Sequence, residues 1–217
     1  MYYQSKARRK GFFARFLLLF SVFLLAVATL YTVASLKDAR AVYQNVVRLH
    51  ILADSDDGDE QRLKLKVRDA LLDEYGAALS AREGKADTVA YLDSELSKIR
   101  ALCERTVAGE GASHAVSVSL CNEYYPTRAY DGFDLPAGQY TSLRIEIGSG
   151  EGKNWFCMVY PPLCTASAEA DEALLEAGFS ESQVRLLTEN EEGYTLRFKI
   201  VETVSDCVER VKAWWNR

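Results

Sequence analysis

Residues 46–60 read VVRLHILADSDDGDE, and this stretch decides the fold. Its first seven residues are rich in β-branched and apolar types, which predicts a strand over residues 46–52. The acidic residues that follow predict a turn and a helix start, because carboxylates accept the free N–H groups of a first helical turn. A helix is therefore predicted over about residues 59–81. Its apolar stripe consists of Leu63, Val67, Ala70, Leu71 and Ala78.

Downstream of this unit the hydrophobic period changes twice. A second amphipathic helix is predicted over about residues 87–106. Three period-two segments follow, rich in β-branched and aromatic residues, at 114–121, 140–147 and 155–160. Helical spacing returns at about residues 168–177, before Gly178, and at about 194–215. Strands grouped between helices predict a single α+β domain over residues 46–217, with a mainly antiparallel sheet flanked by amphipathic helices.

The first 36 residues differ from this domain. Five cations and no acidic residue come first: Lys6, Arg8, Arg9, Lys10 and Arg15. Residues 16–36 then read FLLLFSVFLLAVATLYTVASL, an uncharged run that is about as long as a bilayer's hydrocarbon core is thick. The segment predicts export, either as a signal peptide cut near Val33-Ala34-Ser35 or as an uncleaved transmembrane anchor. Residues 37–45 are predicted to form a polar spacer.

Charge and cysteine usage narrow the function classes. All 31 acidic residues and 21 of the 26 basic residues lie in residues 37–217, which gives this part a net charge of −10. Such a domain does not attract nucleic acid or anionic lipid. Five cysteines are too few for a disulfide scaffold, although export permits disulfides. Cys157 and Cys164 form the candidate pair, while Cys103 and Cys207 fit buried thiols.

Two loops suggest ligand sites, but neither matches the sequence motif that such a site requires. A calcium loop that starts at Asp54 would place Gly58 and Leu65 where oxygen ligands are needed, so helix capping and solvated charge explain the acidic turn better. The glycine-rich residues 148–152 read GSGEG, but a phosphate cradle should open a helix, and the next residues read as a strand. A glycine hairpin connection is predicted there.

The sequence proposes no enzyme by itself. His50 and His114 are the only histidines, and neither accompanies a nucleophile motif or a zinc-binding spacing. No metal, cofactor or small-molecule substrate is predicted. Prolines, glycines and aromatics are dense between residues 125–140 and 154–164. They indicate either rigid loops or an interface, since aromatics and Arg are enriched at binding hot spots.

At these residues the sequence resembles the stage II sporulation protein R family. The first matching block, residues 47–56, reads VRLHILADSD. It continues through Asp59 and Gln61 to residues 64–69, which read KLKVRD. The second block, residues 135–144, reads LPAGQYTSLR, followed by Gly148, Gly150, Gly152, NWFC at 154–157 and PPLC at 161–164. RFKIVE at 197–202 resembles the C-terminal block. Asp54 and Phe156 depart mildly from the family pattern.

This resemblance implies an exported signalling protein of endospore-forming bacteria. Family members cross the forespore membrane into the space between the forespore and mother-cell membranes. There they trigger a membrane-embedded aspartic protease, the sigma-E factor processing peptidase, which removes the pro-sequence of sigma-E. The family has no established catalytic residues. The expected partners are therefore this protease and the membrane that holds the N-terminal segment.

One of two alternative surfaces is predicted to bind the protease. One is the acidic turn with the start of its helix, and the other consists of loops that carry aromatic and basic residues. The residues are Asp54, Ser55, Asp56, Gln61, Lys64 and Arg68 in the first, and Arg128, Tyr130 and Trp155 in the second. Two alternatives stay open: an extracytoplasmic hydrolase that uses Cys157 or Cys164 with His50, and an envelope protein with a purely structural role.

Overall fold

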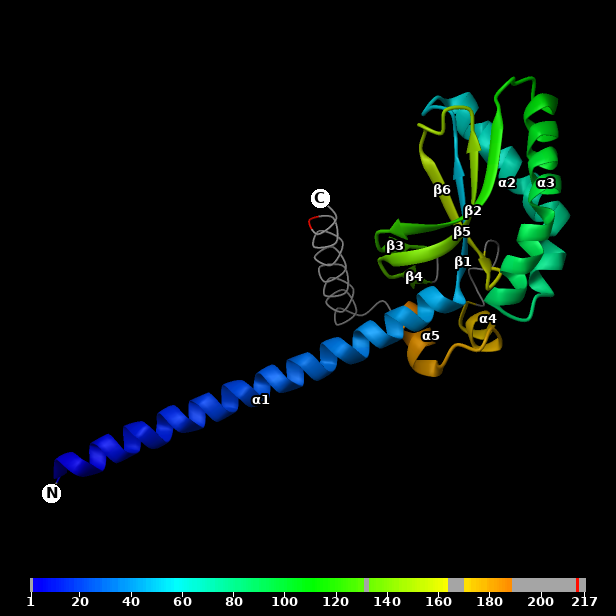
Figure 1. Cartoon of the computed structure of the whole chain (residues 1–217). Helices are drawn as coiled ribbons and strands as arrows, with labels where there is room; N and C mark the ends of the chain where they lie inside the picture. The colour runs from blue at the N-terminus through cyan, green and yellow to red at the C-terminus, as the bar shows by residue number, and fades with distance from the viewer. Residues whose placement is uncertain (1, 131–132, 164–169, 189–213, 215–217) are drawn as a thin grey trace.

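The computed structural model describes residues 2–130, 133–163, 170–188 and 214 (Figure 1). Its main sheet has four strands in the order β2-β5-β1-β6: β1 (Val47–Leu52), β2 (Val116–Tyr125), β5 (Gly138–Ile147) and β6 (Asn154–Tyr160). The predicted α+β class is confirmed. The sheet is mixed at its centre, because β1 lies parallel to β5 while the two outer pairings are antiparallel. Two helices, β2 and two short strands separate β1 from β5 in the chain, which gives the length that a parallel connection needs.

Two long helices cover one face of this sheet. They are α2 (Gly58–Ser80) and α3 (Lys85–Gly109), close to the predicted ranges 59–81 and 87–106. Their apolar stripes pack on the inward residues of β1, β5 and β6, with Leu49, Leu71 and Leu143 fully buried among them. Figure 1 shows both helices on the same side of the strands. This layer is the larger core of the domain.

A second layer covers the opposite face. It contains the end of α1 (Tyr2–Asn45), the short pair β3 (Arg128–Ala129) and β4 (Asp134–Leu135), α4 (Ala170–Glu176) and α5 (Glu181–Thr188). Val42 is fully buried in this core, so the predicted spacer over residues 37–45 is helical and its last turn belongs to the domain. The helix predicted over residues 194–215 lies outside the described residues, apart from Trp214.

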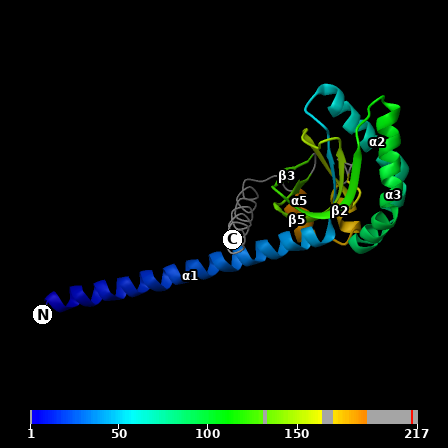
Figure 2. The ribbon, with the colours of Figure 1, turned by 45° about the horizontal axis from the view of Figure 1, so that its top comes forward.

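Helix α1 leaves the domain as a long rod in both views (Figures 1 and 2). Large apolar side chains along it are exposed, including Phe16, Leu19, Phe23 and Leu30. Within the described part of the chain, none of the helices has the length and apolar character that crossing a membrane requires.

The cysteines divide into bonded and free thiols. Cys157 is buried and disulfide-bonded, whereas Cys164 and Cys207 lie outside the described residues, so the pairing with Cys164 stays a prediction. Cys103 is a buried free thiol, as predicted, and burial raises its pKa to about 12. Cys121 is a half-buried free thiol on β2.

Candidate functional site

The acidic turn folds back onto the glycine-rich loop at residues 148–153. The Ser149 and Lys153 backbone N–H groups donate to Oδ1 of Asp54 and Asp56 respectively, each at 2.6 Å. The Gly152 N–H donates to the Ala53 carbonyl at 2.9 Å. Hydrogen bonding from Ser149 is the main cause that holds the pKa of Asp54 below its usual range. The turn after β1 and the loop after β5 therefore form one hydrogen-bonded unit.

Glycines make this close approach sterically feasible. A Cβ added at Gly148 would overlap the Asp54 carboxylate, and one at Gly152 would overlap the Ser55 carbonyl. Gly148 also has a φ of +65°, a left-handed conformation that L side chains rarely adopt. The predicted hairpin between the flanking strands is wrong, because β1 lies between β5 and β6 in the sheet. The glycines instead admit the turn that follows β1.

Two residues of α2 complete this unit. The Gln61 side-chain amide donates to the Ser55 carbonyl at 2.7 Å. Lys64 is buried, and its ammonium donates to Gln61 Oε1 at 2.5 Å and to the Lys153 carbonyl at 2.7 Å. Burial lowers the pKa of Lys64. We call this unit the turn clamp. It consists of Asp54, Ser55, Asp56, Gln61 and Lys64 with the loop over residues 148–153.

The sixth predicted residue of this surface lies apart from the clamp. The Arg68 guanidinium lies 5.1 Å from the centre of the Trp155 ring and forms an ion pair with Asp69 at 2.5 Å. Both Arg68 and Trp155 remain partly exposed. The structure thus joins one residue from each predicted surface into a single cation–π pair on α2 and β6.

Arg128 and Tyr130 belong to a cluster on the other face of the sheet. Its centre is Arg48, whose guanidinium is 0 % exposed and lies 4.0 Å from the centre of the Tyr125 ring. Nη2 of Arg48 donates to the Tyr130 hydroxyl at 2.7 Å. Exposed Arg128 lies 4.8 Å from the centre of the Phe156 ring. We call this the Arg48 cluster, made of Arg48, Tyr125, Arg128, Tyr130, Tyr140 and Phe156.

A second polar group lies next to this cluster. His50 Nδ1 lies 3.0 Å from Oε2 of Glu123, and the same carboxylate also accepts hydrogen bonds from Tyr125 and Arg144. Burial alone would raise the pKa of Glu123, but the hydrogen bonds from Tyr125, His50 and Arg144 outweigh it and lower that pKa. His50 also stacks on Phe156, with ring centres 4.5 Å apart. The glutamate is therefore held as a carboxylate.

Cys157 does not pair with His50 as a catalytic thiol, and Cys164, the other candidate thiol, lies outside the described residues. Leu49 is opposite Cys157 in the sheet register, and His50 is opposite Phe156. Since side chains alternate along a strand, His50 and Cys157 point to opposite faces. Cys157 is also disulfide-bonded and has no free thiol.

Comparison with known proteins agrees with these motifs. The model of the family described as Stage II sporulation protein R (spore_II_R) matches residues 43–170. The curated protein of that name from Bacillus subtilis (strain 168) is 32% identical over 179 residues, which covers 74% of this chain and 80% of the relative. The chain belongs to the stage II sporulation protein R family. No solved structure matches it.

The family match includes both the turn clamp and the Arg48 cluster. Family membership confirms the resemblance and gives the chain a role in sporulation. Arg48, Glu123 and Tyr125 were missed as site residues by the sequence interpretation. A charged residue in the middle of an apolar strand, as at Arg48, was the signal that could have revealed this polar group.

Proposed function

We propose that this chain is the exported signal that activates a membrane-embedded aspartic protease and so starts processing of pro-sigma-E in the mother cell. The family match over residues 43–170 carries the proposal. Two structural features support export. Apolar side chains such as Phe16 and Leu30 are exposed along α1, and Cys157 is disulfide-bonded, which suits an oxidising compartment. Residues 1–36 act as the signal peptide or anchor.

The signal acts by binding, not by chemistry on the protease. A bound protein shifts its receptor toward activity only when it binds the active state more tightly than the inactive one. The turn clamp uses its polar groups within the chain, so the exposed parts of Arg68, Trp155 and Arg128 are the better contacts. Arg beside an aromatic ring is a frequent composition of binding hot spots.

Co-production in a non-sporulating bacterium tests the function. The full chain, the protease and pro-sigma-E are expressed together, and the length of the sigma factor is followed by immunoblot. Shortening is expected only when all three are present. A matched chain lacking residues 1–36 stays in the cytoplasm and should leave the sigma factor unprocessed. Processing without this chain, or none with all three proteins, would reject the proposed function.

A further inference from the structure

Strand β2 forms one edge of the described sheet. It pairs with β5 over ten positions without a register shift, so no bulge bends it away. Its sequence, VSVSLCNEYY, contains no Pro and no Lys, which commonly protect edge strands, and its one charged residue, Glu123, is paired with His50 and Arg144. No further strand of the described residues pairs with this side of β2, and a long, regular edge of this kind is a template for another strand.

The register identifies the backbone groups that face this open side. The Gly148 N–H donates to the Ala115 carbonyl at 2.9 Å, and the same pairing continues along β2. Because bonded and non-bonded pairs alternate in an antiparallel ladder, odd-numbered residues of β2 bond to β5. Leu120 and Asn122 therefore direct their N–H and C=O groups away from β5.

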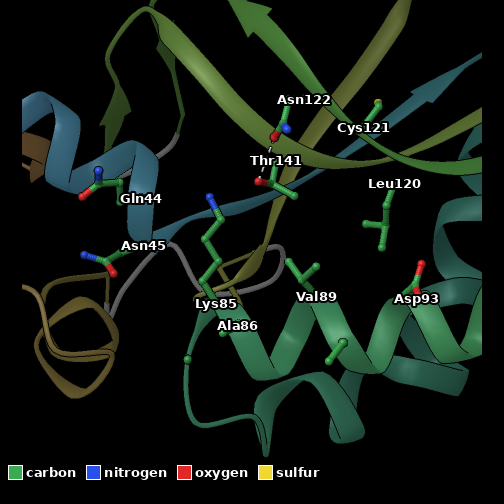
Figure 3. Close-up of a pocket in the computed structure, with 12 residues that line it drawn as sticks. Gln44, Asn45, Lys85, Ala86, Val89, Asp93, Leu120, Cys121, Asn122 and Thr141 are labelled. Carbon is green, nitrogen blue, oxygen red and sulfur yellow. Dashed lines mark hydrogen bonds between the residues drawn. The ribbon is translucent and has the colours of Figure 1, made fainter.

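A groove runs beside these residues. It has a volume of about 860 Å³ and lies between β2 and the first turns of α3, next to the end of α1. Figure 3 shows Leu120 and Asn122 on the strand side and Ala86, Val89 and Asp93 on the helix side. Its lining is more apolar than polar. The groove can thus take side chains of a segment whose backbone pairs with β2.

We propose that β2 and this groove bind an extended segment of the protein partner, which adds a strand to the sheet. The partner segment is short, has alternating apolar residues and carries no net negative charge. Backbone pairing supplies affinity, and the groove beside Val89 and Leu120 selects the side chains. This identification of the partner as the protease rests on the proposed function.

Charge disfavours a second copy of the chain as the occupant. Residues 37–217 carry a net charge of −10, so two such domains repel each other on approach. Within the groove lining, Asp93 is exposed, while the Lys85 ammonium donates a hydrogen bond to the Tyr43 carbonyl at 2.8 Å. A neutral or basic segment therefore fits this surface better than another acidic one.

Two substitutions test the edge without touching the β2–β5 ladder. Asn122→Pro removes an outward N–H together with the side chain that accepts a hydrogen bond from Thr141, and proline tolerates edge positions. Asn122→Ala is its matched control, since it loses the same side chain and the same contact with Thr141 but keeps the N–H. Ala86→Trp fills the groove from an exposed position on α3. Circular dichroism and thermal melting of the full chains verify that each variant folds.

The readout is recovery of the protease with the tagged full chain, together with sigma-factor processing in the co-production strain. Asn122→Pro and Ala86→Trp are each expected to reduce recovery about tenfold or more, and Asn122→Ala less than about twofold. Normal recovery with both disruptive variants overturns the edge proposal while the proposed function stands. Failure of the wild-type chain to recover the protease overturns both. A wild-type dimer in light scattering that Asn122→Pro converts to a monomer would instead assign the edge to self-association.

Discussion

The turn clamp and the Arg48 cluster are both polar units beside β1, yet they differ in how fully their charged groups are hydrogen-bonded. In the clamp, Asp54 and Asp56 accept backbone N–H groups, and buried Lys64 has two acceptors. In the cluster, Arg48 is buried under aromatic rings, and its Nε and Nη1 have no hydrogen-bond partner among the described residues. His50 Nε2 in the adjoining group is unpartnered in the same sense.

This difference separates a unit that stabilises the fold from a unit that we expect to serve signalling. Buried polar groups are nearly always hydrogen-bonded, and an unpaired one costs free energy. The clamp meets this rule with contacts that join segments about 95 residues apart. Among the described residues the Arg48 cluster does not, so we expect it to contribute less to stability than the clamp does. Clamp substitutions should therefore damage folding, and cluster substitutions should damage signalling first.

The largest effect is expected at Gly152. Gly152→Ala places a Cβ onto the Ser55 carbonyl, a backbone atom that can move only if the turn moves. The free energy of unfolding should fall by about 3 kcal/mol. Gly150→Ala is the matched control. A Cβ there lies 3.5 Å from its nearest neighbour, a Glu146 oxygen, so its only penalty is the backbone strain of a φ of +68°. Its cost should be about 1 kcal/mol. Denaturant unfolding of both variants measures the difference, and equal losses would contradict the clamp.

A smaller loss of stability and a larger loss of function are expected at Arg48. Arg48→Met removes a buried charge and fills similar space, a change that costs little in several buried ionic sites. The lost cation–π contacts with Tyr125, Tyr140 and Phe156 should reduce the unfolding free energy by about 2 kcal/mol or less.

Processing of pro-sigma-E by the Arg48→Met chain should nonetheless fall at least about tenfold, because the cluster supports exposed Arg128 through Phe156. Immunoblots at matched protein levels measure this. A folded Arg48→Met chain with wild-type processing would show that the cluster is purely structural.

The pH dependence tests the group beside the cluster. Glu123 has a folded pKa below its ordinary value of 4.5, so it contributes stability above that pH and loses the contribution as pH falls through the folded pKa. Melting temperature should therefore drop on acidification below about pH 5. The Glu123→Gln variant should have a lower melting temperature at neutral pH, and that temperature should fall less steeply on acidification. An equally steep fall would mean that other carboxylates dominate acid unfolding.

Local pattern was enough to predict β1 from its β-branched and apolar residues, and α2 and α3 from their long helical hydrophobic period. The parallel pairing of β1 with β5 was not predictable in this way, since register depends on contacts between distant segments. The glycines at residues 148–152 show the same limit. Their need for conformational freedom was visible, but Asp54, which occupies the space above Gly148, lies 94 residues earlier. The Arg48 cluster likewise draws its rings from three further strands and a loop.

The smallest change in stability is expected at Arg68, which lies outside both polar units. Its guanidinium stacks on Trp155 at a partly exposed site, where a cation–π contact contributes about 0.5 kcal/mol. Arg68→Ala should lower the unfolding free energy by roughly that amount. Arg68→Lys, the matched control, keeps the charge and should lower it less. If the Arg68–Trp155 pair contacts the protease, Arg68→Ala reduces sigma-factor processing far more than this small change in stability predicts. Processing that follows stability alone would leave Arg128 and the β2 edge as the contact surfaces.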